Sequence, residues 1–116
     1  MEGFASAWVA AWNGRDVEAV LAHFHEDAVF TSPIAERLAI APDGAVRGKE
    51  ALRRYWCEAL ARHQTLHFVL KDVFVGVNAI VIRYENEDGV ERAEVLVFEE
   101  DLVVEGHGMF CVSAVR

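Results

Sequence analysis

Hydrophobic residues recur with helical spacing at the start of the chain. Phe4, Trp8 and Trp12 follow one another at four-residue intervals with alanines beside them, so they share one face of a helix. Asn13-Gly14 predicts the end of that helix. Asp16 is a good N-cap for a second, short helix whose apolar positions follow at i, i+3, i+4 and i+7, namely Val17, Val20, Leu21 and Phe24.

The middle of the chain predicts a short strand, a loop and a long helix. Residues 28–31 are β-prone, and Ser32-Pro33 is expected to end them, with a loop over residues 34–41. A third helix is expected from about residue 49 to residue 62. Its apolar positions form one buried face, made of Leu52, Tyr55, Trp56, Ala59 and Leu60.

Every segment after residue 65 is typical of strands. Residues 66–75, 79–86, 90–98 and 102–112 are rich in Val, Ile and Phe, and short turn sequences separate them. Connections this short require antiparallel neighbours, because a parallel crossover needs about a dozen residues or more. The pattern predicts a single α+β domain over residues 1–116.

The turns suggest how the strands pair. If Asp88-Gly89 is a two-residue turn, Arg83 lies opposite Glu94, and a three-residue loop at 99–101 places Glu94 opposite Gly106. Both faces of this sheet are largely apolar, whereas a sheet with one solvated face alternates apolar and polar residues. Three helices can cover only one face. We therefore expect a homodimer through the outer face.

Composition and charge exclude several classes of partner. The 116 residues carry 11 Lys and Arg against 19 Asp and Glu, a net charge of −8, so we expect no binding to nucleic acid or to an anionic membrane. No apolar stretch approaches the roughly 20 residues that span a bilayer. The start of the chain lacks the basic segment of a secretory signal, and the two cysteines, Cys57 and Cys111, read as small buried hydrophobes. We expect a reduced, cytoplasmic protein.

Glu94 is the leading candidate for chemistry. A carboxyl group among apolar residues has its charged form disfavoured, and it can then act as an acid or base near neutral pH. In this hypothesis Arg83, opposite Glu94, tunes the carboxyl group. The alternative is that Arg83 and Glu94 form a purely structural ion pair. Ser32 is a third candidate, placed to position a substrate by a hydrogen bond, although a serine before proline is often only a turn residue.

Aromatic residues and glycines suggest a ligand cavity. The glycines of β-prone residues 102–112 would leave room for a ligand opposite Glu94, unless they form a bulge. His23 and His25 point away from each other on a helix, so we expect no metal site and no cofactor. His107 falls on the predicted outer face. The candidate ligand-binding residues are Trp8, Trp12, Phe30, Tyr55, Gly106, Gly108 and Phe110.

Several segments together resemble a known family. The Asn-Gly-x-Asp turn at 13–16, the segment FHEDAVFTSP at 24–33, the segment VRGKEALRRYW at 46–56 and the antiparallel sheet that follows resemble the SnoaL-like branch of the nuclear transport factor 2-like superfamily. The resemblance covers nearly the whole chain. It implies a cone in which three N-terminal helices pack on a curved, mainly antiparallel sheet, with a pocket at the wide end and dimerisation through the outer face.

The resemblance does not imply one activity, because this fold hosts isomerases, polyketide cyclases, dehydratases, epoxide hydrolases and binding modules. The ketosteroid isomerase pattern places its oxyanion-hole Tyr at Trp8, its general-base Asp at Ser32 and its protonated Asp near Glu94. Only Glu94 keeps the required chemistry, so 3-oxosteroid isomerisation is not predicted.

Three hypotheses for function follow. The first is acid-base chemistry on a small hydrophobic carbonyl or hydroxyl compound, with Glu94 handling the proton. The second is a non-catalytic ligand-binding or dimeric scaffolding domain, and the third is a subunit of a larger assembly.

Overall fold

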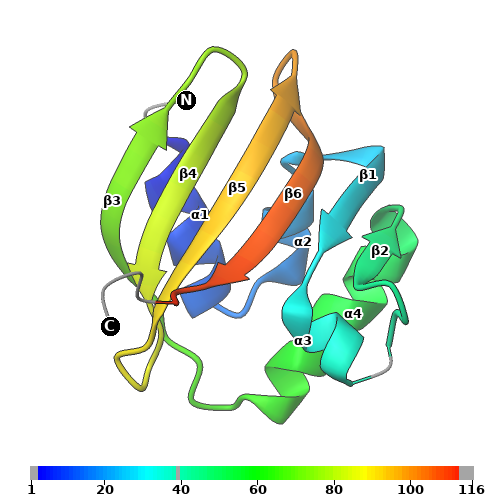
Figure 1. The fold of residues 1–116 in the computed structure, drawn as a ribbon, viewed down its shortest axis with the longest axis vertical. Coiled ribbons are helices and arrows are strands. Elements are labelled where there is room, and N and C mark those ends of the chain that lie inside the picture. Colours follow the sequence, from blue (N-terminus) through cyan, green and yellow to red (C-terminus); the bar gives the residue numbers. More distant parts are fainter. Residues whose placement is uncertain (1–2, 39, 113–116) are drawn as a thin grey trace.

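Four helices gather on one face of a six-stranded sheet in the computed structural model, which describes residues 3–38 and 40–112. Figure 1 looks onto the other face, with α1 and α2 behind the strands, and no element of the described ranges covers that face. The helices are α1 (Phe4–Asn13), α2 (Val17–Leu21), α3 (Pro33–Arg37) and α4 (Lys49–Arg62). None of these helices has the length and apolar character that a membrane span requires.

The sheet is curved and mainly antiparallel, which confirms the expected fold class. Its strands lie in the order β2-β1-β6-β5-β4-β3, and only β1 and β6 are parallel. The strands are β1 (Phe24–Thr31), β2 (Ala45–Arg47), β3 (Val69–Val75), β4 (Ala79–Glu85), β5 (Glu91–Glu99) and β6 (Leu102–Phe110).

The core lies between the helices and the inner face of the sheet. On α1, Trp8 and Trp12 are buried, and the Trp12 ring meets the Trp56 ring of α4 with centroids 5.4 Å apart. The bounds of α4 agree with the predicted helix, and four of its five expected apolar positions are buried, Ala59 being half-buried. Asp16 caps α2 as predicted, because its Oδ1 accepts a hydrogen bond from the Ala19 N–H at 3.0 Å.

Two segments between the first helices and α4 differ from the prediction. The second helix ends at Leu21, and Phe24 already begins β1, so that strand is longer than expected. The loop expected directly after Ser32-Pro33 is wrong, because this dipeptide begins α3. Ser32 is the N-cap and Pro33 occupies the first turn, where the missing N–H of proline costs nothing.

The register predicted for the β4–β5 hairpin is off by one residue. Gly89 does not occupy the centre of a two-residue turn. It is the last residue of a longer turn and has a φ of 73°. In this turn the Gly89 N–H donates to the Asn86 carbonyl, and the Asn86 N–H donates to the Val90 carbonyl. Glu94 therefore lies opposite Ile82, and Arg83 opposite Ala93. A shift of one residue moves every side chain of β4 to the other face.

The β5–β6 hairpin differs as well, but with less effect. A two-residue turn at 100–101 pairs Glu99 with Leu102, and an irregularity follows between Val97 and Phe98. Glu94 consequently lies opposite Gly108 and not opposite Gly106. Because this shift is two residues, Glu94 and both glycines stay on the predicted common face.

Candidate functional site

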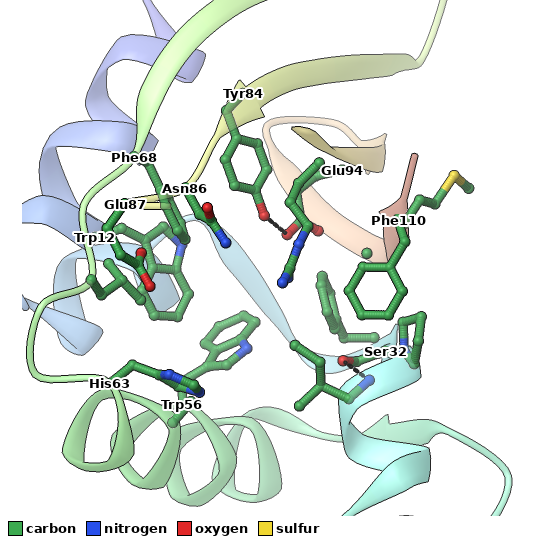
Figure 2. A pocket seen from close by; sticks show the side chains of 18 of the residues that line it. Trp12, Ser32, Trp56, His63, Phe68, Tyr84, Asn86, Glu87, Glu94 and Phe110 are labelled. Atoms are coloured by element: carbon green, nitrogen blue, oxygen red, sulfur yellow. Dashed lines mark hydrogen bonds between the residues drawn. The ribbon is translucent and has the colours of Figure 1, made fainter. Parts of the chain in front are cut away.

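A cavity of about 250 Å³ lies between α1, α4 and the inner face of the sheet. Its volume is slightly below the roughly 300–1,000 Å³ of typical ligand sites, so it suits a small ligand. Figure 2 shows Glu94 and Tyr84 on its sheet side, Trp56 and His63 on α4 and the turn after it, and Phe110 on the far side from Trp12. Six of the seven predicted ligand-binding residues line it: Trp8, Trp12, Phe30, Tyr55, Gly108 and Phe110. Whether they contact a ligand stays a prediction.

Glu94 is the central polar group of this cavity. This residue is only 8% exposed, and its Oε1 accepts a hydrogen bond from the Tyr84 hydroxyl at 3.2 Å (Figure 2). Its Oε2 is also buried but has no hydrogen-bond partner within the described residues. The carboxyl group is thus half satisfied, with one oxygen held by the protein and the other left without a partner.

Burial determines the charge of Glu94. The apolar surroundings disfavour the ionised carboxylate and raise the pKa of Glu94 to about 8, although the Tyr84 hydrogen bond and the positive charge of Arg92 both act to lower it. At neutral pH the group is mostly a neutral carboxylic acid. Burial also raises the pKa of Tyr84 well above its usual value, so its hydroxyl stays protonated and donates to Glu94.

The two glycines of β6 have different roles. A Cβ added at Gly108 would lie 3.5 Å from Glu94 Oε2 and 3.5 Å from Phe30 Cζ, an ordinary contact distance, so this position keeps space beside the carboxyl group. A Cβ at Gly106 would lie 2.7 Å from Phe30 Cδ2. The space at Gly106 is therefore filled by the Phe30 ring, and the expectation that Gly106 leaves room for a ligand is wrong.

The predicted pairing of Arg83 with Glu94 is also wrong. Because of the one-residue register shift, Arg83 lies on the outer face, where its Nε donates to Asp72 at 2.7 Å and its Nη1 to Glu91 at 2.7 Å. The positive charge near Glu94 comes from Arg92, which lines the cavity. Alternation along β5 could have identified Arg92, since it is two residues from Glu94 and shares its face.

Ser32 lines the cavity, where it holds two elements in place. Its Oγ accepts hydrogen bonds from the N–H groups of Ile34 at 3.2 Å and Ala35 at 3.4 Å, and lies 2.8 Å from the Tyr55 hydroxyl of α4. It thus caps α3 and ties it to α4. The predicted role in positioning a substrate stays a hypothesis, because the same oxygen already has three neighbours.

Tyr84, like Arg92, is a site residue that sequence reasoning missed. The mistaken register placed it on the outer face, away from Glu94. The ketosteroid isomerase comparison assigned the position of the hydroxyl donor to Trp8, whereas here Tyr84 supplies the hydroxyl and the Trp8 ring packs on it with centroids 5.3 Å apart.

Other residues noted in the sequence lie outside the cavity. His107 is on the outer face, as predicted, with its Nδ1 2.6 Å from Thr31 Oγ1 and its Nε2 2.6 Å from Glu105 Oε2. Cys57 and Cys111 are free and exposed, so the expectation that they are buried hydrophobes is wrong.

Unsatisfied polar atoms are concentrated at the cavity. Within the described residues, three buried side-chain nitrogen or oxygen atoms have no hydrogen-bond partner: Trp12 Nε1, Arg92 Nε and Glu94 Oε2. All three belong to residues that line this one cavity. Buried polar atoms in folded proteins are nearly always paired, so such a concentration requires an explanation.

Comparisons with known proteins agree on the fold. The model of a family described as the SnoaL-like domain matches residues 5–110. A SnoaL-like protein of unknown function from Burkholderia thailandensis is 32% identical, with a TM-score of 0.90 over 96% of this chain and 93% of the other. An uncharacterised cystatin-fold protein from Novosphingobium aromaticivorans is 23% identical, with a TM-score of 0.73 over 90% and 93% of the two chains.

A more distant solved structure was determined together with a small molecule. It is that of TerC co-crystallised with polyporic acid, 12% identical, with a TM-score of 0.76 over 91% of this chain and 87% of the other. At this identity the likeness concerns the fold. No curated protein matches the sequence.

Proposed function

This chain belongs to the SnoaL-like domain family, and from the polar groups of its cavity we propose that it binds a small hydrophobic molecule bearing a carbonyl or hydroxyl oxygen and performs acid-base chemistry on it. The observation that carries the proposal is the gathering of three buried, unpaired polar atoms around one apolar cavity. A ligand with oxygen atoms at those points would supply the missing partners.

Glu94 is the proton-handling group in this proposal. As a neutral acid whose Oε1 is held by Tyr84, it presents an O–H at Oε2, and that O–H donates to the ligand oxygen. As negative charge develops on that oxygen, the hydrogen bond strengthens or the proton transfers. The hydroxyl of Tyr84 stabilises the resulting carboxylate. This chemistry suits isomerisation, cyclisation or dehydration of a carbonyl or hydroxyl compound.

A non-catalytic binding domain is the alternative. It would use the same cavity and the same hydrogen bond, without proton transfer. The presence of a cavity favours either form of ligand binding over a purely scaffolding role, in which the aromatic side chains would fill the interior.

The proposal is tested by a thermal-shift screen of ketones, lactones and epoxides, followed by product analysis for each compound that raises the melting temperature. We expect at least one such compound, and we expect Glu94→Gln to reduce its turnover by about 10²–10⁴-fold, the usual contribution of a general acid. Glu91→Gln is the matched control, because it removes a carboxylate of the same strand from the outer face.

Two outcomes would count against parts of this account. A diverse screen without a stabilising compound contradicts the small-molecule proposal as a whole. Stabilisation without any product, in wild type and variant alike, contradicts the acid-base step and leaves the non-catalytic alternative.

We also propose a homodimer through the outer face of the sheet. That face carries apolar side chains that the described helices do not cover, including Phe74, 60% exposed, and Met109, 45% exposed. The half-buried Val81, Val95 and Val97 lie on the same face. Large exposed apolar surfaces on a folded protein usually mark an interaction site. A second copy brings the same apolar centre, so the contact is self-complementary.

A cytoplasmic location is part of the same proposal. Both cysteines are free and exposed, which suits a reducing compartment.

A further inference from the structure

Arg92 is a charged residue of the cavity that has no counter-ion among the residues that the structure describes. It lies on β5, two residues before Glu94 and on the same face, and it is half-buried. Its Nε is buried without a hydrogen-bond partner, and no ion pair found within residues 3–38 and 40–112 includes it. The buried Glu94 Oε2 also lacks a partner, so it does not supply the hydrogen bond that Arg92 Nε is missing.

The surroundings of Arg92 hold its guanidinium in place. Its Cζ lies 4.5 Å from the centre of the Phe110 ring, a cation-π contact that orients the planar group. A second arginine, Arg37 of α3, lies over the same ring at 5.0 Å, but Arg37 is exposed and does not line the cavity. The Phe110 end of the cavity is therefore locally positive, although the chain as a whole is acidic.

The acidic residues of the rim lie elsewhere. Glu87 and Asp88 line the cavity from the β4–β5 turn, and Figure 2 shows Glu87 beside Trp12, across the cavity from Phe110. An anionic group would thus be repelled at the Glu87 side and attracted at the Arg92 side. An unpaired, partly buried guanidinium is suited to a carboxylate, which it can bind through two parallel N–H···O bonds.

We propose that the ligand is a small aromatic or alicyclic carboxylate with a carbonyl or hydroxyl oxygen on the ring carbon next to the one that bears the carboxylate. Arg92 binds its carboxylate, and Glu94 binds its second oxygen. Residues two apart on a strand lie roughly 6.5–7 Å apart along the backbone and point to the same face, so Arg92 and Glu94 can contact two neighbouring oxygen-bearing groups of one small ligand. The aromatic walls hold the ring. This inference rests on the proposed function and specifies its ligand class.

The test compares 2-hydroxybenzoate with 2-hydroxybenzamide, which has nearly the same shape but no charge, by isothermal titration calorimetry at neutral pH. We expect the wild type to bind the carboxylate at least about tenfold more tightly, the usual gain from a charge-assisted hydrogen bond. Arg92→Gln removes this preference. Arg37→Gln, which removes the other arginine on Phe110, keeps it.

The outcomes separate this inference from the proposed function. If the amide binds the wild type as tightly as the carboxylate, or if Arg92→Gln keeps the preference, the ligand class is overturned while binding of neutral compounds still supports the proposed function. If neither probe nor any neutral compound of the thermal-shift screen binds, both fail. The comparison in the wild type decides the question even if Arg92→Gln does not fold.

Discussion

Gly106 and Gly108 lie two residues apart on β6 but have different surroundings. Gly106 packs against the core, and Gly108 lines the cavity. Both lie on the inner face of β6, and neither has a positive φ, so added side chains would act through space and not through backbone strain. A methyl group at Gly106 would overlap Phe30 and approach Leu96 Cδ2 at 3.0 Å, whereas one at Gly108 would meet only ordinary contacts.

We therefore predict opposite consequences for two alanine substitutions. Gly106→Ala should lower the free energy of unfolding by about 1–3 kcal/mol, the usual cost of overpacking a core. Gly108→Ala should change it by less than about 1 kcal/mol, while it weakens the binding of any ligand that contacts Glu94. Urea denaturation measures the free energy of unfolding of both variants. Equal stability of the two variants would contradict the assigned roles.

Glu94 lowers the stability of the folded chain near neutral pH. Such a loss of stability is typical of residues that serve a function. Its pKa rises from 4.5 to about 8 on folding, so between these pH values the folded chain holds a proton that the unfolded chain has lost. The free energy of unfolding then falls as pH rises through this window, by about 1.4 kcal/mol per pH unit from this group, and is unaffected below and above it.

The sequence supported the inward position of Glu94 but not its neighbours. Strand alternation and the family resemblance both placed this carboxyl group among apolar residues. The identity of its partner depended on hairpin register, and an error of one residue exchanged Tyr84 for Arg83. Pairing between strands depends on the geometry of the turn, which a two-letter signal such as Asp-Gly does not define.

Among the elements, the long α4 and the strands that follow it were predictable, because their apolar periodicity extends over many residues. Of the short ones, α2 was predicted from its N-cap, but α3 and β2 were not. Ser32-Pro33 predicts a break after a strand, but Ser at the N-cap and Pro in the first turn also begin helices, as they do here. The three-residue β2 has too few positions to show a period.

Element order explains why the site forms where it does. Ser32, the N-cap of α3, follows directly after β1, and its contact with Tyr55 at 2.8 Å ties α3 to α4. Arg92 and Glu94 enter from the middle of the sheet, on β5. The cavity is therefore enclosed by segments distant in sequence, and its full lining follows from the fold and not from one local motif.

For the whole molecule, the bare face of the sheet leads to a prediction of oligomeric state. Analytical ultracentrifugation should give twice the mass of one chain, because burying the apolar outer face excludes water from it. Val95→Lys, at the centre of that face, should shift the protein to a monomer, whereas Ala10→Lys on the exposed side of α1 should not.

Two results would contradict this arrangement. One is a monomeric wild type, and the other is a Val95→Lys variant that remains a dimer. Melting curves of both variants establish that the lysine has not simply unfolded the chain.

The central claim is that the cavity contains a carboxylic acid which stays neutral at physiological pH, and NMR titration of the Glu94 carboxyl carbon measures this directly. Glutamate labelled with ¹³C at that carbon gives the resonances, and Glu94→Gln identifies the one that belongs to this residue. We expect a midpoint near 8. A midpoint near 4.5, the value of an ordinary glutamate, would show a carboxylate already ionised in the cavity and would contradict this claim.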